Sequence, residues 1–445
     1  MRLRSIIIAV PLSYGFFGGL FGGLFGGGIG LASAQTPSPT PPTLTLKQAQ
    51  DIAVANHPQI QAAAFRALAA RAAVVEVRSV YYPQVQGAST GAAAESGTRI
   101  TAGLFNNPTV FSRQGDGALV NQFITDFGHT GKLVQTSVLR ANAQDENTVA
   151  TRADVLVAVN QAYYGALRAQ SVLTVAQETV AARQAVVDQV AALEASGLKS
   201  GLDLSFAQVN LAQAKLLLIQ AQNDNDAAFA FLNAALGNSS DRLYTLVDEP
   251  IPPALVDTVA NLVNQAIRDR PDLISLRINR DADYKFVEAE RTLWYPTISS
   301  EAAAGLTPAH VAGLQSNYAA AAINISIPIF NGHLFSARRA EAEYNAHASD
   351  QNVRNQENLI TRDVRIAWLN ANTAFQALGV TAQLLDESQQ AMDLAQARYN
   401  LGLSSIVELS QAQLNLTQAQ IANAGAKYDY QVRRAELNYQ IGALQ

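Results

Sequence analysis

Residues 397–413 read ARYNLGLSSIVELSQAQ, and residues 195–208 read ASGLKSGLDLSFAQ. In both stretches a helix-forming pattern leads up to a glycine, Gly197 or Gly402, and a second helix-forming pattern follows within a few residues. Glycine is the residue that most often stands just after the end of a helix. A serine placed three residues before a carboxylate then gives a start signal for the next helix. The two stretches therefore predict two helical hairpins.

The two hairpins belong to a unit that is written twice. One block recurs 205 residues later, so that Gly197, Leu204, Gln208, Leu211, Ala214 and Gly237 match Gly402, Leu409, Gln413, Leu416, Ala419 and Gly442. Another block recurs at an offset of 213 residues, with Tyr81-Tyr82-Pro83 matching Trp294-Tyr295-Pro296. Several matches at one offset indicate an internal duplication.

The N-terminus has the pattern of a targeting segment. Arg2 and Arg4 precede a long apolar stretch, and Ala32-Ser33-Ala34 fits a small-residue cleavage site. Residues 1–34 are therefore expected to be a signal peptide for export. The glycine spacing of the apolar stretch also suits a retained membrane anchor, so both interpretations stay open.

The rest of the chain divides around the duplication. We expect a Pro/Thr-rich linker at 35–43, a first structural repeat at 44–237, an inter-repeat or equatorial segment at 238–261, and a second repeat at 262–445. The segment between the repeats contains EPIPP, which cannot continue a helix.

Each repeat predicts the same order of elements. A helix of about 35 residues, 45–80 in the first repeat, ends before a Tyr-Pro pair, and two strands follow. A very long helix, 132–196 or 334–400, then leads to the hairpin turn and to a helix of about 32 residues. The expected breaks between helix and strand are Pro83, Pro296, Gly128 and Gly332.

The long helices are too long for an ordinary globular domain, because each would span roughly 100 Å. Small and apolar residues recur along them at alternating steps of four and three, on two faces. Two such seams predict a helix with a neighbour on either side, as in a wall. The two shorter helices of a repeat, stacked end to end, would match one long helix.

The strands carry a period of two in the second repeat. Ile323, Ile325 and Ile327 alternate with Asn324 and Ser326, so one face is apolar and is expected to meet lipid. Four strands per chain cannot close a membrane barrel, which needs about eight or more. Several chains would have to share one barrel.

Composition excludes several other classes. The 445 residues are 49% apolar and 15% charged, and no apolar run long enough for a spanning helix follows residue 35. The net charge of −5 and the absence of a basic stretch exclude a nucleic-acid partner. There is no cysteine, the five histidines are scattered without a metal motif, and no catalytic motif is found. We therefore expect no enzyme, no cofactor and no metal site.

The export signal, the duplicated helix–strand–strand–helix–helix unit, the Tyr-Pro breaks and the glycine-centred hairpins resemble the TolC-like outer-membrane efflux protein family. The resemblance implies a mainly α fold with a transmembrane β part: a long antiparallel coiled-coil helical barrel, plus four strands per chain in a shared 12-stranded trimeric β-barrel. It implies a bacterial outer-membrane location, with a helical tunnel in the periplasm and contact with outer-membrane lipid. The implied function is the passive exit duct of a tripartite efflux or type I secretion system. The implied partners are two further copies, a periplasmic adaptor and an inner-membrane pump.

The resemblance also assigns roles to the hairpin tips. The adaptor-docking tips would be Gly197, Leu198, Lys199 and Ser200 with Gly402, Leu403, Ser405 and Ile406. The periplasmic aperture would involve Asp203, Glu408, Tyr399, Ser404 and Gln411. In the family a tyrosine matching Tyr399 pairs with the carboxylate matching Asp203. Ser404 and Gln411 replace a basic and an acidic residue that are common in the family, which implies a weaker lock and a weaker charge ring.

Each of these roles has a plainer alternative. Asp203 and Glu408 also fit capping boxes at the starts of helices. Tyr399 continues an apolar seam, so a packing role competes with a gating bond. At the level of the whole chain, the alternative to a channel is a periplasmic coiled-coil scaffold or adaptor without a membrane barrel.

Overall fold

The computed structural model describes residues 42–93, 95, 113–239, 242–307 and 315–444. The chain separates into two units, residues 1–41 and residues 42–445. The expected signal peptide and most of the expected 35–43 linker lie outside the described residues. All helices and strands of the described residues belong to the second unit.

The second unit contains the same series of helices twice, with equal lengths. The first series is α1 (Leu46–Asn56), α2 (Pro58–Arg78), α3 (His129–Ala195) and α4 (Gly201–Ala235). The second is α5 (Val259–Asp269), α6 (Pro271–Arg291), α7 (Leu334–Asn400) and α8 (Ile406–Gln440). Helix α5 begins inside the stretch 238–261 that the sequence suggested as a linker. Its first turn is capped by Thr258, whose hydroxyl accepts the N–H of Asn261.

The single helix expected at 45–80 is wrong, because it is broken at His57. This residue has an extended backbone, and Pro58 is the first residue of α2. A residue before proline is disfavoured in the helical conformation, which explains the break. The second repeat is interrupted in the same way at Arg270, before Pro271. Short 3-10 turns, Ser79–Tyr81 and Thr292–Trp294, then lead into the strands.

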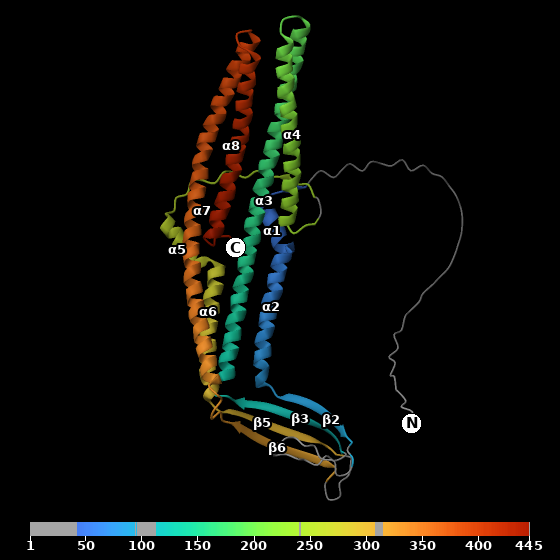
Figure 1. Cartoon of the computed structure of the whole chain (residues 1–445), viewed down its shortest axis with the longest axis vertical. Coiled ribbons are helices and arrows are strands. Elements are labelled where there is room, and N and C mark those ends of the chain that lie inside the picture. The colour runs from blue at the N-terminus through green and yellow to red at the C-terminus, as the bar shows by residue number, and fades with distance from the viewer. Residues whose placement is uncertain (1–41, 94, 96–112, 240–241, 308–314, 445) are drawn as a thin grey trace, which may run out of the picture. The chain divides into compact units, whose positions relative to one another are not determined.

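The shorter helices stack end to end, as the lengths suggested. Gly237, just past the end of α4, lies so close to the α1–α2 break that a Cβ at this position would be 2.9 Å from the Cα of His57. Gly442, just past the end of α8, would bring a Cβ within 3.0 Å of the Asp269 backbone. Helix α4 is therefore continued by α2, and α8 by α6, to form columns that run beside α3 and α7 (Figure 1).

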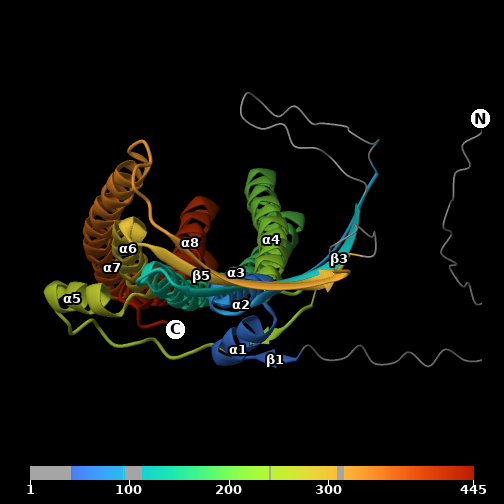
Figure 2. The ribbon, with the colours of Figure 1, turned by 90° about the horizontal axis from the view of Figure 1, so that it is seen from below.

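The columns form a wall whose order is α4 with α2, then α3, then α8 with α6, then α7. Figure 2 shows α1, α5 and β1 (Thr43–Leu44) on one side of this row of helices. The two free edges of the wall are the α4–α2 column and α7. Helices α4 and α7 of one chain are thus separated by α3 and α8.

A belt crosses one face of the wall at mid-height. It consists of β1, the parallel strand β4 (Thr245–Leu246) and the segment that follows. The hydroxyl of Tyr163 on α3 donates to the carbonyl of Val247 (2.6 Å) and accepts the N–H of Val247 (3.2 Å). Farther along, Tyr430 on α8 donates to the carbonyl of Pro253 (2.8 Å). The belt therefore ties the connection between the repeats to both halves of the wall.

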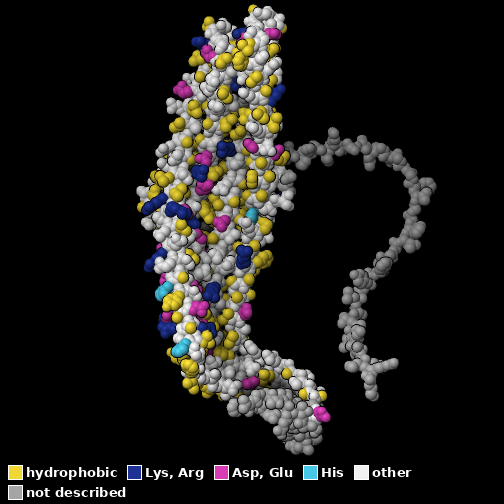
Figure 3. All heavy atoms as spheres, viewed as in Figure 1, with side chains coloured by type: hydrophobic (Ala, Val, Ile, Leu, Met, Phe, Trp, Pro, Cys, Tyr) yellow, Lys and Arg dark blue, Asp and Glu magenta, His cyan; other side chains and the backbone are white. Residues whose placement is uncertain are grey.

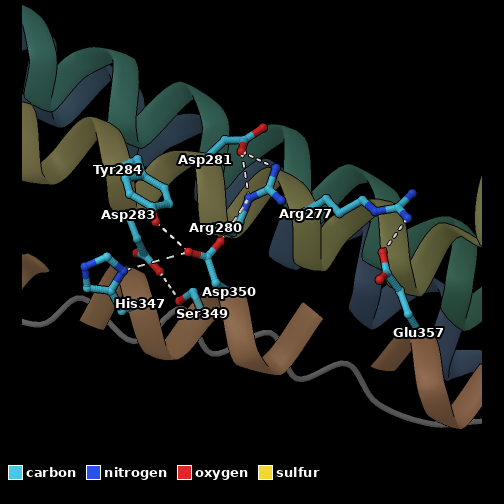
Figure 4. Close-up of polar contacts among 9 residues, drawn as sticks. All are labelled: Arg277, Arg280, Asp281, Asp283, Tyr284, His347, Ser349, Asp350 and Glu357. Atoms are coloured by element: carbon cyan, nitrogen blue, oxygen red, sulfur yellow. Dashed lines mark hydrogen bonds and ion pairs between the residues drawn. The ribbon is translucent and has the colours of Figure 1, made fainter. Parts of the chain in front are cut away.

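Polar side chains join α6 to α7 below the belt (Figure 4). The Tyr284 hydroxyl donates to Asp350 (2.5 Å), and the Ser349 hydroxyl donates to Asp283 (2.6 Å). Arg277 forms an ion pair with Glu357 at 2.7 Å. These pairs are partly exposed, so each contributes little stability by itself.

Four antiparallel strands form a sheet in the order β2-β3-β5-β6. They are β2 (Gln84–Ala92), β3 (Arg113–Thr125), β5 (Thr297–Leu306) and β6 (Asn317–Ser326). Most of the chain between β2 and β3 lies outside the described residues. Pro83 and Pro296 stand immediately before β2 and β5.

The register gives the sheet two different faces. One face is mostly apolar and carries Val85, Val120, Ala302, Ala321, Ile323 and Ile325. The other face carries Gln84, Asn121, Glu301 and Asn324, and the Asn324 amide donates to Glu301 (3.4 Å). Ile327 is not a strand residue as expected, because β6 ends at Ser326. Pro328 has no N–H for the sheet, which explains the early end.

The strand-to-helix corners use left-handed backbone. Gly128 has φ 106° and Gly332 has φ 61°. Each has a non-glycine neighbour that is also left-handed, Phe127 (φ 55°) or His333 (φ 69°). Within the described ranges, no helix has both the length and the apolarity needed to cross a bilayer.

Candidate functional site

The two hairpin turns have the same backbone geometry. Gly197 (φ 72°) and Gly402 (φ 71°) follow the ends of α3 and α7 in the left-handed conformation. In the second turn the N–H of Leu403 donates to the carbonyl of Arg398 (2.8 Å), and that of Gly402 donates to the carbonyl of Tyr399 (3.0 Å). The first turn repeats this pair of bonds. Two bonds of this kind close a helix end when glycine supplies the positive φ.

The carboxylate of Asp203 caps α4 in the first turn. The Ser200 hydroxyl accepts the N–H of Asp203 (3.2 Å), and Asp203 accepts the N–H of Ser200 (3.2 Å). The Ser200 hydroxyl also donates to the same carboxylate (2.9 Å). This is the full capping box that the sequence suggested as the plainer role.

The matching carboxylate in the second turn has a different partner. The Ser405 hydroxyl accepts the N–H of Glu408 (3.4 Å), but the reciprocal bond of a capping box is not formed. The Glu408 carboxylate instead pairs with the Arg398 guanidinium, with Nε and Oε1 3.1 Å apart. A full capping box at this position is therefore wrong. The two turns have the same backbone but different charge pairing.

Tyr399 is buried at the junction of the two hairpins. It packs with Val186 and Val190 of α3 and with Ile406 and Leu409 of α8. Among the described residues its hydroxyl has no hydrogen-bond partner. Burial, and after it the nearby charge of Asp203, raise the pKa of this tyrosine. The hydrogen bond to Asp203 that the resemblance implied is not formed in this structure.

Lys199 connects the first turn to the second. Its ammonium nitrogen lies 4.6 Å from the centre of the Tyr399 ring, which is a favourable distance for a cation–π contact. The turns are joined a little farther from the tip by Asn210, whose amide donates to the Ser410 hydroxyl (2.7 Å). The tips of one chain therefore form one connected structure.

The remaining tip residues differ in exposure. Leu198 is 71% exposed and Leu403 is 66% exposed, so both are available to a partner. Ile406 is only 3% exposed, because it packs on Tyr399 and Leu409, and its expected place on a docking surface is wrong. The Ser404 hydroxyl is buried without a partner among the described residues.

The side-chain amide of Gln411 donates to Asn415, one turn along α8 (2.9 Å). Sequence reasoning missed Arg398 and Lys199 as electrostatic residues of the tip. Arg398 stands directly before Tyr399 and ten residues before Glu408, on the other arm of the hairpin. The sequence pattern that could have revealed it is an arginine and a glutamate on opposite arms of a predicted hairpin turn.

Stripes of exposed apolar side chains lie on α4 and α7, the helices at the two free edges of the upper wall. Phe206, Leu216 and Phe231 are exposed on α4, and Leu369, Leu384 and Leu394 are exposed on α7. The α4 residues lie 5, 15 and 30 positions after Gly201, where α4 begins. The α7 residues lie 6, 16 and 31 positions before Asn400, where α7 ends. The two stripes are therefore in register when measured from the tips.

Two stretches of the chain, residues 50–238 and 262–443, match the family model described as "Outer membrane efflux protein". The chain belongs to the outer membrane efflux protein family. It is accordingly an outer-membrane protein that serves as an exit duct in efflux.

Relatives within this family are distant but cover most of the chain. The chain is 22% identical to the outer membrane protein TolC of Salmonella enteritidis, over 90% of this chain and 83% of that protein. It is 25% identical to the outer membrane protein OprJ of Pseudomonas aeruginosa, over 89% of this chain and 84% of that protein.

Solved structures show the same family fold. A membrane protein from Pseudomonas aeruginosa matches with a TM-score of 0.77 and 22% identity, covering 89% of this chain and 93% of that chain. The open state of the Neisseria gonorrhoeae MtrE outer membrane channel matches with a TM-score of 0.74 and 18% identity, covering 90% and 89%. The mainly helical fold with a strand part is therefore confirmed.

Proposed function

We propose that three copies of this chain form one passive duct, with a helical tunnel in the periplasm and a shared β-barrel of 12 strands in the outer membrane. The duct receives cargo from an inner-membrane pump through a periplasmic adaptor. It performs no catalysis. The observation that supports this most directly is the pair of apolar stripes on the two free edges of the wall.

The stripes suit a ring in which α7 of one chain packs against α4 of the next. Rotation about a cyclic axis keeps every residue at its own height, so such an interface needs complementary patches at equal heights. Leu384 and Leu216 meet this condition, because they lie 16 positions from the tip end of α7 and 15 positions from the tip end of α4. Soluble proteins rarely leave long apolar stripes uncovered. A second copy is the occupant that matches both edges at once.

The sheet supports the membrane part of the proposal. Its outer strands β2 and β6 have free edges, and unpaired backbone groups are not tolerated in lipid. Pairing β6 of one chain with β2 of the next would remove both edges. The apolar face with Ile323 and Ile325 would then meet lipid, and the face with Glu301 and Asn324 would meet water.

The tips support the docking part. Leu198 and Leu403 are exposed beside glycine turns around which the structure leaves open space. An adaptor that presents apolar side chains to these turns would cover them. The carboxylates of Asp203 and Glu408 would lie at the entrance that the tips surround.

Planar-bilayer recordings test the proposal. Protein purified from outer membranes should run as a trimer in detergent and give discrete single-channel conductance steps. A water-soluble monomer without conductance would instead favour the periplasmic scaffold. Recovery of the chain with adaptor and pump after cross-linking at Leu198→Cys or Leu403→Cys tests the docking part separately.

A further inference from the structure

A groove runs along the upper wall between α3, α4 and α8. Its volume is about 730 Å³, within the range of pockets that hold drug-sized ligands. Its lining includes seven alanines together with Gly165, Val172, Phe231 and Ile421. Apolar side chains are visible over this part of the helices in the space-filling view (Figure 3).

The groove lies on the face of the wall opposite to the belt. Val172 follows Tyr163 by nine residues, which is about 2.5 helical turns, so the two side chains leave α3 on opposite sides. Tyr163 contacts the belt, and Val172 lines the groove. If the ring of the proposed function forms with the belt outside, the groove opens into the tunnel. The inference below rests on that proposed function.

One cation in the groove has no acidic partner. The guanidinium of Arg168 lies over Gly425 of α8, where three of its atoms would be 3.7–3.9 Å from a Cβ at that position. These are ordinary van der Waals distances, so Arg168 lies in direct reach of the α8 backbone at this position. No described carboxylate forms an ion pair or hydrogen bond with Arg168, so its donors are available to a ligand.

Charge is distributed unevenly along the groove. On the side of Arg168 away from the tips, the lining from Ala158 to Gly165 and from Ala227 to Ala235 contains no charged residue. This uncharged part extends about 15 Å along α3 from Ala158 to Arg168. Asp224, which is also without an ion-pair partner among the described residues, lies on the tip side. A ligand with its anionic end at Arg168 and an apolar body in the uncharged part meets favourable contacts throughout.

We propose that this groove binds amphiphilic organic anions, with a carboxylate, sulfonate or phosphate on Arg168 and an apolar body no longer than about 15 Å along the alanine-lined part. Guanidinium matches such groups because its donors form a planar fork. The duct would then carry a binding site of its own for this class of cargo at mid-height. An amphiphilic cation would gain nothing from Arg168 and would be attracted only to Asp224.

Two fluorescent probes that share an aromatic body test the proposal. The trimer in lipid nanodiscs is titrated with 8-anilinonaphthalene-1-sulfonate and with neutral N-phenyl-1-naphthylamine, and empty nanodiscs give the background. Wild type should bind the sulfonate in a saturable way, with one site per chain. Arg168→Gln should weaken this binding at least about tenfold and leave the neutral probe unchanged. Arg168→Lys should retain part of the affinity.

A variant that fills the groove provides a second test of the binding site. A side chain at Gly165 would enter open space, so Gly165→Leu should occupy the groove without a clash and weaken both probes. Gly379→Leu is the matched control, since Gly379 is a mid-helix glycine of α7 that is equally open and does not line the groove. If neither Arg168→Gln nor Gly165→Leu lowers the affinity for the sulfonate probe, the proposal is overturned.

Conductance measured on the same preparations separates the two proposals. If the channels conduct normally but probe binding is unchanged in Arg168→Gln, the proposed duct is supported and the proposed binding site is contradicted. If the protein gives no channel conductance, the proposed duct is contradicted.

Discussion

The Nε atom of Arg398 lies 3.1 Å from the Oε1 atom of Glu408, across the turn of the second hairpin. Asp203, at the matching position of the first hairpin, forms no ion pair within the described part of the chain and caps its helix through Ser200. Duplicated turns with nearly identical backbones therefore differ in the charge that they present. In a three-fold ring the Glu408 charges would be largely neutralised and the Asp203 charges would not.

Removing the cation should uncover the Glu408 charge. Arg398→Gln should make the channel more cation-selective and more sensitive to block by divalent cations, because three freed carboxylates would face the entrance. Both side chains are about half exposed, so the loss of stability should be no more than about 1 kcal/mol. Reversal potentials in a salt gradient measure the selectivity. Arg398→Lys keeps the charge and serves as the control; equal shifts in the two variants would mean that charge is not the cause.

The Tyr399 hydroxyl should be dispensable. It makes no hydrogen bond among the described residues, so Tyr399→Phe should change stability by less than about 1 kcal/mol and leave the conductance unchanged. A double-mutant cycle of Tyr399→Phe with Asp203→Asn should give a coupling near zero, within about 0.5 kcal/mol. A large coupling together with a more open channel would restore the gating bond that the family resemblance implied. Lys199→Gln should instead lose about 0.5–1 kcal/mol of cation–π stabilisation.

Two left-handed glycines should respond differently to the same change. Gly197→Ala should cost about 1–2 kcal/mol, because alanine disfavours positive φ and nothing else surrounds the site. Gly237→Ala should cost about 1–3 kcal/mol more, since its new Cβ would also press on the His57 backbone. Thermal unfolding of the two variants compares them directly. Equal losses would contradict the end-to-end packing of α4 on α2.

Acid should weaken the connection between α8 and the α5–α6 break. Burial opposes ionisation of Asp272, but the hydrogen bonds and the charge of Arg270 outweigh it and hold the pKa of this carboxyl below its usual value near 3.8. A carboxylate whose pKa is lowered by folding stabilises the folded state at pH values above its unfolded pKa. This stabilisation is lost as the pH falls through the folded pKa. The free energy of unfolding of wild type should therefore exceed that of Asp272→Asn by its full amount at neutral pH, and this difference should shrink below about pH 4. Asp281→Asn removes a more exposed ion pair and should give a smaller gap.

The sequence predicted the repeated long elements well. Helices α3 and α7 follow from sustained seams, and the turns at Gly197 and Gly402 follow from glycine and serine signals that act within a few residues. The break at His57 was not predicted, although Pro58 disfavours the helical conformation of the residue before it. The end of β6 was placed one residue too late, because the alternation through Ile327 outweighed the proline at 328.

The tip contacts were harder to predict because they depend on side chains far apart in the sequence. The pairing of Arg398 with Glu408 requires the turn geometry, and the burial of Tyr399 requires α3, which lies about 200 residues earlier. Ile406 resembles an exposed tip residue in a linear reading, yet it begins a helix whose first turn faces the neighbouring hairpin. The groove at Arg168 combines residues of α3, α4 and α8, and no local sequence pattern brings these helices together.

Disulfide formation between Leu384→Cys and Leu216→Cys tests the central claim, that α7 of one chain packs on α4 of the next. The chain has no cysteine of its own, and α4 and α7 of one chain are separated by α3 and α8. Oxidation of the double variant in outer membranes should therefore produce covalent dimers and trimers, and no larger species. The mismatched pair Leu384→Cys and Val209→Cys uses the same face of α4 two turns nearer the tip, about 12 Å away in height, and should stay monomeric. A monomer from the matched pair, or equal cross-linking of both pairs, would contradict the ring.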